Sequence, residues 1–301
     1  MKQKVYVLGN GYIGKNLNQL NEGHYDVTVL NKDEHQYNHP EMFINILDQH
    51  KPDYIINACG FTGKPNVDAC EGEKQYCWEL NVNLPVTLST ICKSYGVPFI
   101  HVSSGCIYTG YEKEYTEQDT PNFGMGMKQS SWYSKTKHAA ELAMKSSDAY
   151  IMRIRMPFCS KNTDRSILSK VLKYDKLIEY KNSMTSVEDF TTFIHNFLDR
   201  LRIDLNSLPW NRDIKPGIYN VCNPGTASLR DIVTIFKYHG VGNGDWKFVN
   251  IDKLKLKANR SNCVLDCTKI HKLGLSLPSI EVSLDNAIRL KCVDIITGKN
   301  D

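Results

Sequence analysis

The sequence predicts an α/β protein built on a doubly wound parallel sheet, with a smaller α/β region toward its C-terminus. Short apolar segments alternate with amphipathic segments of helical spacing through the first half of the chain. A glycine-rich turn directly follows the first apolar segment. Alternation of this kind places helices on both faces of a parallel sheet. The 301 residues suffice for one large domain or for two intimate ones.

The expected strands are short and apolar, and they lie at residues 5–8, 27–30, 54–58, 98–103 and 149–155. The expected helices have amphipathic spacing, and they lie at residues 13–20, 41–50, 78–95 and 133–145. Beyond Arg155 the pattern becomes less regular, with turn signals between short segments. We therefore expect residues 1–158 to form the sheet domain, with 183–222 returning to it. Residues 159–182 and 223–301 are expected to cover the carboxyl edge of the sheet, where open parallel sheets bind their ligands.

Composition and charge exclude several classes of protein. Hydrophobic residues make up 41% of the chain and charged residues 23%, which is typical of a soluble globular protein. The net charge of +4 is spread along the sequence without a basic run, so neither nucleic acid nor a membrane is expected as a partner. The N-terminus lacks the pattern of a signal peptide. The ten cysteines are scattered without metal-ligand spacing, which favours free thiols, no metal site and a cytoplasmic location, in the host cytoplasm if the chain is viral.

The glycine-rich turn matches the pattern GxGxxG at the end of the first expected strand. Such glycines allow a tight turn and a close backbone approach, so that a pyrophosphate can rest on the N-terminus of the next helix. The turn therefore predicts a dinucleotide site, although a merely structural turn is the alternative. The residues expected at the cofactor are Gly9, Asn10, Gly11, Tyr12, Ile13 and Gly14.

The end of the second expected strand bears on the choice of cofactor. An acidic residue there suits the ribose hydroxyls of NAD, whereas a basic residue suits the 2′-phosphate of NADP. Here the strand is followed by Asn31 and Lys32. We therefore expect NADPH, with NADH as the open alternative and with Lys32 as a solvated loop charge in that case.

Tyr133 and Lys137 stand at i and i+4 on one face of an expected helix. An ammonium near the phenol is expected to lower the pKa of the tyrosine and to hold the nicotinamide ribose. Tyr133 could then protonate a ketone oxygen as hydride reaches the carbon. Ser104, at the end of a strand, could donate to the same oxygen. The alternative is that Tyr133 and Lys137 are ordinary residues on a helix surface, without a catalytic role.

These features together resemble the extended short-chain dehydrogenase/reductases, which have a Rossmann fold. The resemblance rests on the glycine turn, residues 57–60 after a central strand, Ser104, and the Tyr133/Lys137 pair. The family usually shows GxxGxxG, from which this chain departs. The resemblance implies that Ala58 lies at the cofactor, together with Tyr133 and Lys137.

Longer stretches resemble the nucleotide-rhamnose synthase epimerase-reductases of plants and giant viruses. These stretches are residues 60–68, 104–108, 117–123, 132–137, 153–157, 182–185 and 260–262. The resemblance implies conversion of UDP-4-keto-6-deoxyglucose to UDP-L-rhamnose, with residues 159–182 and 223–301 as the substrate-binding region. It also implies a homodimer, while the choice between UDP and dTDP stays open.

Inversion at C3 and C5 beside a 4-keto group needs an acid, a base, and donors to the enolate oxygen. The resemblance implies that Cys106 and Lys170 are this pair, with Cys106 as the base and Lys170 as the acid; the reverse assignment stays open. By strand alternation, Cys106 would share a side with Ser104 if the strand extends that far. The alternatives are a packed small residue for Cys106 and a surface charge for Lys170.

The resemblance also implies that Arg260 contacts the substrate diphosphate, for which a guanidinium is well suited. A solvated arginine is the alternative. Four further residues are expected near the cofactor or the sugar, and we assign them to the substrate site: Thr62, Lys64, Asn66 and Asn81. Two other functions stay open, a monofunctional dTDP- or UDP-4-keto-rhamnose reductase and a non-catalytic dinucleotide-binding regulatory protein.

Overall fold

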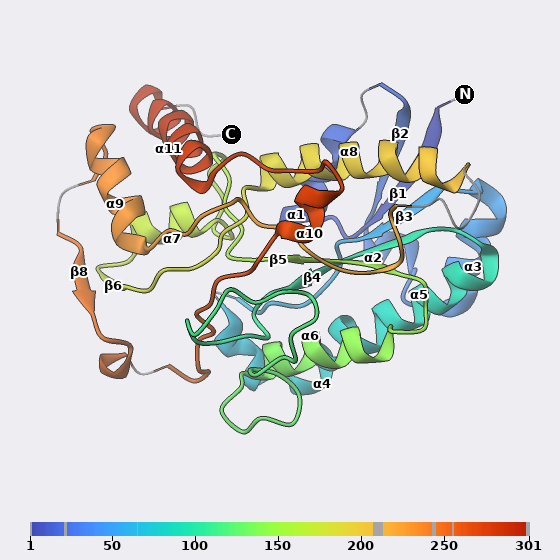
Figure 1. Cartoon of the computed structure of the whole chain (residues 1–301), viewed down its shortest axis with the longest axis horizontal. Helices are drawn as coiled ribbons and strands as arrows, with labels where there is room; N and C mark the ends of the chain where they lie inside the picture. Colours follow the sequence, from blue (N-terminus) through green and yellow to red (C-terminus); the bar gives the residue numbers. More distant parts are fainter. Residues whose placement is uncertain are drawn as a thin grey trace.

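The central sheet of the computed structural model is parallel throughout, with the strand order β2-β1-β3-β4-β5-β7 (Figure 1). The structure describes residues 2–20, 23–64, 66–206, 213–242, 245–254 and 256–298. The strands are β1 (Gln3–Leu8), β2 (Tyr25–Leu30), β3 (Tyr54–Asn57), β4 (Phe99–Ser104), β5 (Tyr150–Ile154) and β7 (Gly217–Asn220). The predicted doubly wound parallel sheet is confirmed.

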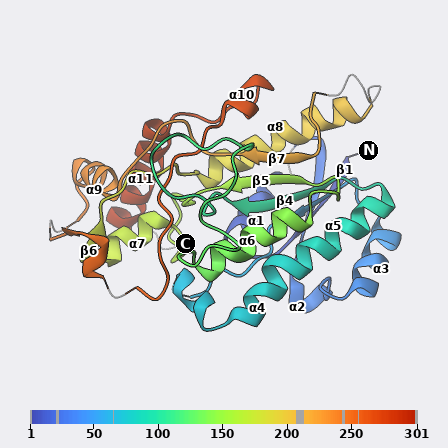
Figure 2. The same ribbon diagram turned by 60° about the horizontal axis from the view of Figure 1, so that its bottom comes forward.

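Helices cover both faces of the sheet, as Figures 1 and 2 show. On one face lie α1 (Tyr12–Leu17) and α8 (Val187–Leu205), and on the other lie α3 (Pro40–His50), α5 (Leu84–Tyr95) and α6 (Trp132–Ala143). Short elements join them: η1 (Asn18–Leu20), α2 (Lys32–His35), η2 (Val67–Glu71) and α4 (Lys74–Trp78).

The single helix predicted at residues 78–95 is wrong in one respect, because a π-helical segment, η3 (Glu79–Asn83), separates α4 from α5. Pro85 stands in the first turn of α5. Since proline has no N–H, it cannot donate to the carbonyl of Asn81, and the backbone widens there. The widened segment carries Asn81 into the protein interior.

The region beyond the carboxyl edge of the sheet contains a short parallel pair, β6 (Lys176–Ile178) and β8 (Lys247–Val249). Its helical elements are α7 (Ile167–Lys173), α9 (Leu229–Tyr238), η5 (Ile251–Lys253), α10 (Thr268–Lys272) and α11 (Ile280–Thr297). In Figure 1, α7, α9, α11 and the small pair gather on the left, away from the N-terminus. The chain returns to the central sheet between these elements, where β7 pairs with β5 as the edge strand.

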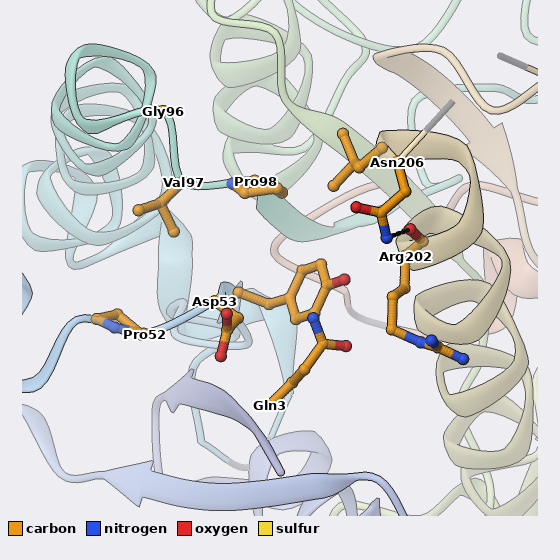
Figure 3. A pocket seen from close by; sticks show the side chains of 10 residues that line it. Gln3, Pro52, Asp53, Gly96, Val97, Pro98, Arg202 and Asn206 are labelled. Carbon is orange, nitrogen blue, oxygen red and sulfur yellow. Dashed lines mark hydrogen bonds between the residues drawn. The ribbon is translucent and has the colours of Figure 1, made fainter. Parts of the chain in front are cut away.

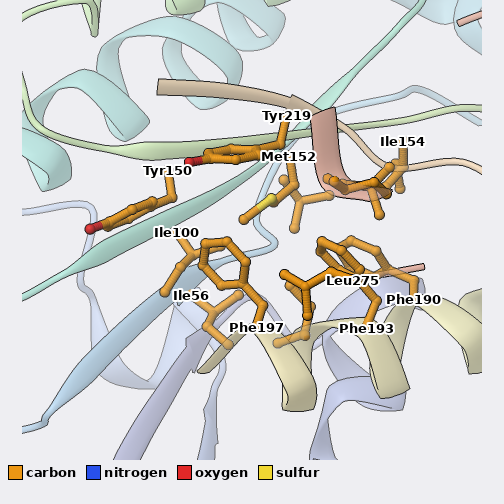
Figure 4. Close-up of a cluster of buried hydrophobic side chains, with 14 of the residues drawn as sticks. Ile56, Ile100, Tyr150, Met152, Ile154, Phe190, Phe193, Phe197, Tyr219 and Leu275 are labelled. Atoms are coloured by element: carbon orange, nitrogen blue, oxygen red, sulfur yellow. The ribbon is translucent and has the colours of Figure 1, made fainter. Parts of the chain in front are cut away.

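The larger core cluster lies between the sheet and α8 (Figure 4). Phe190, Phe193 and Phe197 follow one another along α8 and stack in sequence, with ring centroids 6.4 and 6.0 Å apart. They pack with Ile100 and Met152 of the central strands. Burial of these rings fixes α8 against the sheet.

An open cavity of about 310 Å³ lies at the amino ends of the strands, opposite the carboxyl edge of the sheet (Figure 3). It is lined by Gln3, Asp53 and Pro98, which stand at the amino ends of three strands, and by Arg202 and Asn206 near the end of α8. The Nδ2 of Asn206 donates to the carbonyl of Arg202 there. This cavity is remote from the carboxyl ends of the strands.

Among the described helices, none has both the length and the apolar character that crossing a membrane would require. The ten cysteines are all free thiols.

Candidate functional site

The three glycines of the turn after β1 have different surroundings. Gly9 has φ +106°, and a Cβ there would lie 2.8 Å from the backbone nitrogen of Cys59. At Gly14 a Cβ would lie 1.8 Å from the carbonyl oxygen of Gly9. At Gly11, by contrast, a Cβ would meet nothing within 4 Å. The outer glycines thus let the backbone segments pack closely, while the middle one leaves open space beside the backbone, as a pyrophosphate site requires.

The residues predicted to select the cofactor stand at the end of β2. Asn31 caps α2, because its Oδ1 accepts from the backbone nitrogen of Asp33 at 3.1 Å. The Nζ of Lys32 lies 2.7 Å from Oδ1 of Asp33, and this hydrogen bond raises the pKa of Lys32. The Lys32 side chain is 25% exposed and that of Asp33 is 81% exposed. A cation therefore stands at the carboxyl end of β2, where a 2′-phosphate would lie.

Helix α6 brings Tyr133 and Lys137 to the sheet. Its N-cap is Ser131, whose hydroxyl accepts from the backbone nitrogen of Ser134 at 3.1 Å. Lys137 is 5% exposed, and its Nζ donates to the carbonyl of Val102 in β4 at 3.4 Å. Burial lowers the pKa of Lys137, although Glu141 opposes the effect. A Cβ on Gly60 would come within 3.6 Å of the same Nζ, so the absent side chain leaves room beside the amine.

The pKa of Tyr133 is raised, not lowered as the sequence led us to expect. Burial is the largest cause and the charge of Cys106 adds to it, while the hydroxyl of Ser104 acts in the opposite direction. Desolvation of the phenolate thus outweighs the favourable effect of nearby donors. A phenol in this state is protonated at neutral pH, as a proton donor must be.

A single carboxylate fixes these elements to one another. Glu141 of α6 accepts from Ser103 of β4 at 2.7 Å. It also accepts from Arg153 of β5, from Nε at 3.1 Å and from Nη2 at 2.6 Å. The three groups are buried. The helix that carries Tyr133 is therefore tied to both central strands.

Cys106 lies beyond the end of β4, so the argument from strand alternation does not apply. The strand ends at Ser104, whose hydroxyl accepts from the backbone nitrogen of Cys106 at 3.2 Å. This turn places the half-buried Cys106 in a small cluster with Tyr133. Sequence reasoning missed its other neighbour: Nη1 of Arg155 lies 3.1 Å from the sulfur. Arg155 stands in a stretch that supported the family resemblance, but nothing in the sequence shows where its guanidinium points.

Lys170 and Arg260 both lie beyond the edge of the sheet, near enough for the charge of Arg260 to lower the pKa of Lys170. Lys170 lies on α7, and burial lowers its pKa, with the charges of Arg165 and Arg260 adding to the effect. The Nη1 of Arg260 lies 2.7 Å from Oδ1 of Asp68, in η2. The cations predicted for the acid and the diphosphate contact are thus close to each other.

Arg165 is a second residue that sequence reasoning missed, since it stands in a polar segment without a motif. Its Nη1 donates to Oγ1 of Thr62 at 3.1 Å and to the carbonyl of Gly63. Lys64 is exposed nearby, and Asn66 caps η2 by accepting from the backbone nitrogen of Asp68 at 2.9 Å. Pro65, in the same stretch, lies outside the described residues.

Asn81 is placed differently from the other residues predicted to contact substrate, because its side chain is fully buried. Its Oδ1 accepts from the backbone nitrogen of Phe61 at 2.7 Å. Its Nδ2 donates to the carbonyl of Phe61 at 2.9 Å and to Oγ1 of Thr136 at 3.1 Å. Asn81 therefore joins the loop after β3 to helix α6.

Comparison with known proteins gives a match over nearly the whole chain. Residues 3–291 match the family model described as RmlD substrate binding domain. The bifunctional dTDP-4-dehydrorhamnose 3,5-epimerase/dTDP-4-dehydrorhamnose reductase of Arabidopsis thaliana is 33% identical over 245 residues, covering 78% of this chain and 75% of that protein.

Two solved structures have the same fold. The L780 UDP-rhamnose synthase of Acanthamoeba polyphaga mimivirus has a TM-score of 0.83 at 24% identity, with 96% of this chain and 100% of that chain covered. The dTDP-4-dehydrorhamnose reductase of Bacillus anthracis, in complex with NADP, has a TM-score of 0.78 at 19% identity and covers 95% and 98% of the two chains. The predictions of the fold, of an oxidoreductase and of NADP are confirmed at the level of the family. The chain belongs to the RmlD substrate binding domain family.

Proposed function

We propose that the chain is an NADPH-dependent 3,5-epimerase/4-reductase that converts UDP-4-keto-6-deoxy-D-glucose to UDP-L-rhamnose. The observation that carries the proposal is the position of the Cys106 thiol beside the reducing residues, in a cluster with Tyr133. A reductase alone needs no such thiol. The name of the Arabidopsis relative includes both activities.

The residues around the glycine turn fit a bound NADPH. The open space at Gly11 suits the pyrophosphate, Lys32 suits the 2′-phosphate, and Lys137 suits the nicotinamide ribose. When bound, NADPH would supply the hydride for C4. Tyr133 would give its proton to the C4 oxygen, to which Ser104 also donates.

Epimerisation would precede reduction in the same pocket. Cys106 would remove the proton beside the 4-keto group, and Ser104 and Tyr133 would stabilise the enolate oxygen. Lys170 would return a proton from the other face. The lowered pKa of Lys170, caused by burial and two neighbouring arginines, eases this proton release.

The substrate nucleotide would bind between the two parts of the chain. Residues 1–158 with 183–222 would hold the cofactor, and residues 159–182 and 223–301 would hold the nucleotide sugar. Arg165, which contacts the loop after β3, and Arg260, which contacts Asp68 in η2, supply the positive charge that a diphosphate needs. Asn81 would act by positioning the loop after β3 rather than by touching substrate.

The decisive experiment supplies UDP-4-keto-6-deoxyglucose and NADPH in deuterated water. We expect UDP-rhamnose with deuterium at both C3 and C5. The Cys106→Ala variant should form no deuterium-labelled UDP-rhamnose from this substrate. It should still reduce a 4-keto sugar that has already been epimerised. Cys292→Ala, which removes a thiol on α11, is the matched control.

Other outcomes would replace the proposal. Reduction without exchange at either carbon would make the chain a monofunctional reductase. Binding of NADPH without turnover of UDP or dTDP substrates would make it a non-catalytic dinucleotide-binding protein.

A further inference from the structure

Arg155 is a buried cation that directly follows β5. Only 1% of the residue is exposed. Its Nε donates to the carbonyl of Cys263 at 3.4 Å, and its Nη2 donates to the carbonyl of Ser261 at 2.6 Å and to Oδ1 of Asn182. These acceptors are all neutral. The fourth contact is from Nη1 to the sulfur of Cys106, at 3.1 Å.

Arg153, two residues earlier, shows what a buried arginine ordinarily has in this fold. It is 2% exposed and forms a two-pronged ion pair with Glu141. Within the described part of the chain, no carboxylate forms an ion pair with Arg155. A buried charge without a counter-ion destabilises the folded state. Among the atoms to which Arg155 donates, the sulfur of Cys106 is the one that belongs to an ionisable group.

Of the other groups around Cys106, Lys137 is the one whose charge favours the same state. Lys137 and Tyr133 approach it from α6, and Cys263 approaches it beside Arg155. Cys70 and Cys77 complete the cluster from η2 and α4. Lys137 adds a second cation to that of Arg155, and the phenol of Tyr133 is neutral because its pKa is raised. Cations next to a cysteine favour the thiolate.

We infer that Arg155 is a positioning residue that holds the sulfur of Cys106 in its ionised form, ready to remove a proton from the sugar. The inference deepens the proposed function and rests on it for the role of the thiolate. In the step concerned, an S–H bond forms as the C–H bond beside the ketone breaks. The electron pair moves to the carbonyl oxygen, which becomes the enolate oxygen. No electrons enter or leave, and Arg155 stabilises the thiolate again when the proton departs.

The arrangement also fixes where the sulfur stands. The other guanidinium nitrogens are tied to Asn182, Ser261 and Cys263, all in segments that lie beyond the edge of the sheet. Arg155 therefore cannot follow the sulfur if it moves, and Nη1 defines one position for Sγ.

The wild-type protein provides the first test, with Cys59 as an internal control. Cys59 and Cys106 are the two half-buried cysteines, whereas the other eight are buried. Burial raises the pKa of Cys59. The substrate-free protein is treated with iodoacetamide between about pH 6 and about pH 9, and the alkylated peptides of Cys59 and Cys106 are quantified by mass spectrometry. This pH range is chosen because a free thiol has a pKa of about 8.5.

We expect Cys106 to be alkylated at least about tenfold faster than Cys59 at about pH 6.5, with little further increase at higher pH. A Cys106 rate that rises through about pH 8.5, as for a free thiol, would overturn the inference. This measurement needs no variant and no substrate.

Arg155→Met and Arg155→Lys provide the second test. Without the cation, Cys106 should be alkylated like a free thiol, and deuterium exchange at C3 and C5 should fall by more than about tenfold. Reduction of an epimerised 4-keto sugar should stay within about threefold, and Arg155→Lys should restore part of the exchange. Equal losses of exchange and reduction in a folded variant would indicate a merely structural role and overturn the inference.

If Arg155→Met does not fold, Arg155→Lys and the wild-type alkylation profile decide the question. The two proposals fail separately. An ionised Cys106 without any deuterium exchange would refute the epimerase function, whereas exchange by a protein with a neutral Cys106 would refute the role of Arg155.

Discussion

Arg260 and Asp68 form an ion pair, 2.7 Å from Nη1 to Oδ1, that joins the C-terminal region to the segment after β3. Asp68 also accepts from the backbone nitrogen of Ala258 at 3.1 Å. Arg165 makes a second connection to the same segment through Thr62. Since the side chains of Arg260 and Asp68 are each 22% exposed, the pair is reachable by a ligand. A bound diphosphate could therefore contact Arg260 in place of Asp68.

Arg260→Ala should therefore raise the KM for the nucleotide sugar by about tenfold, which is about 1.4 kcal/mol of binding free energy. The kcat should change less, because Arg260 is proposed to bind the diphosphate and not to act on the carbons that react. Steady-state kinetics at saturating NADPH give both constants. Arg230→Ala is the matched control, since it removes an exposed ion pair with Glu179, and neither residue is among those proposed to contact substrate. An unchanged KM in Arg260→Ala would show that the diphosphate binds elsewhere.

Gly11→Ala should weaken the binding of NADPH, whereas Gly14→Ala should lower the stability of the protein. A Cβ at Gly11 meets no protein atom within 4 Å, so the variant should unfold at the wild-type temperature but bind NADPH about tenfold more weakly. A Cβ at Gly14 would lie 1.8 Å from the carbonyl oxygen of Gly9, so that variant should lose stability. Thermal unfolding and fluorescence titration with NADPH distinguish the two. Wild-type affinity in Gly11→Ala would place the pyrophosphate away from the turn.

Tyr133→Phe should lower the rate of reduction by about 10² to 10⁴ while leaving the affinity for NADPH within about twofold. The phenol supplies the proton, whereas the neighbouring Lys137 would hold the ribose. Stopped-flow measurement of NADPH oxidation with an epimerised 4-keto sugar isolates this step. A folded variant that reduces at the wild-type rate would exclude Tyr133 as the donor.

His101 should make the protein less stable in mild acid. It is fully buried in β4, with Nδ2 of Asn57 3.1 Å from its Nδ1. Burial, and next the charge of Lys137, hold the pKa of His101 well below its usual value. Below about pH 6.5 the unfolded chain therefore binds a proton that the folded chain does not. The free energy of unfolding should fall by up to about 1.4 kcal/mol per pH unit from this group.

Urea unfolding at about pH 7.5 and about pH 5.5 measures the effect, because the histidine titrates between these values. His101→Gln should be less stable than wild type at the higher pH but should lose less stability on acidification. An identical pH dependence in wild type and variant would assign the acid sensitivity to other groups.

The sequence predicted the parts of the site that depend on local patterns. Glycines at fixed spacing, a tyrosine and a lysine one helical turn apart, and a serine at a strand end all follow from short-range geometry. Gly9, Tyr133 and Ser104 accordingly lie where the pattern placed them. The π-helical segment at residues 79–83 was missed, although Pro85 is a local signal for it.

The contacts of Arg155 and Arg165 could not be predicted in the same way. Arg155 and Cys106 are 49 residues apart, and Arg165 and Thr62 are 103 apart. Nothing local distinguishes Arg153, which pairs with Glu141, from Arg155, which contacts a thiol. The raised pKa of Tyr133 was missed for a related reason, since it depends on how completely the tertiary structure excludes water from the phenol.

The contacts of the Glu141 carboxylate bear on how the two proposed activities could evolve separately. The carboxylate joins β4, β5 and α6 next to the residues proposed for reduction, and among the described residues its hydrogen-bond partners are Ser103 and Arg153. Arg155, on the other hand, is held by Asn182, Ser261 and Cys263. Mutations that accumulate in those segments would alter the proposed epimerase while sparing the reductase. A lineage could thus drift toward a specialised reductase, or acquire a new sugar preference, without first dismantling its hydride-transfer chemistry.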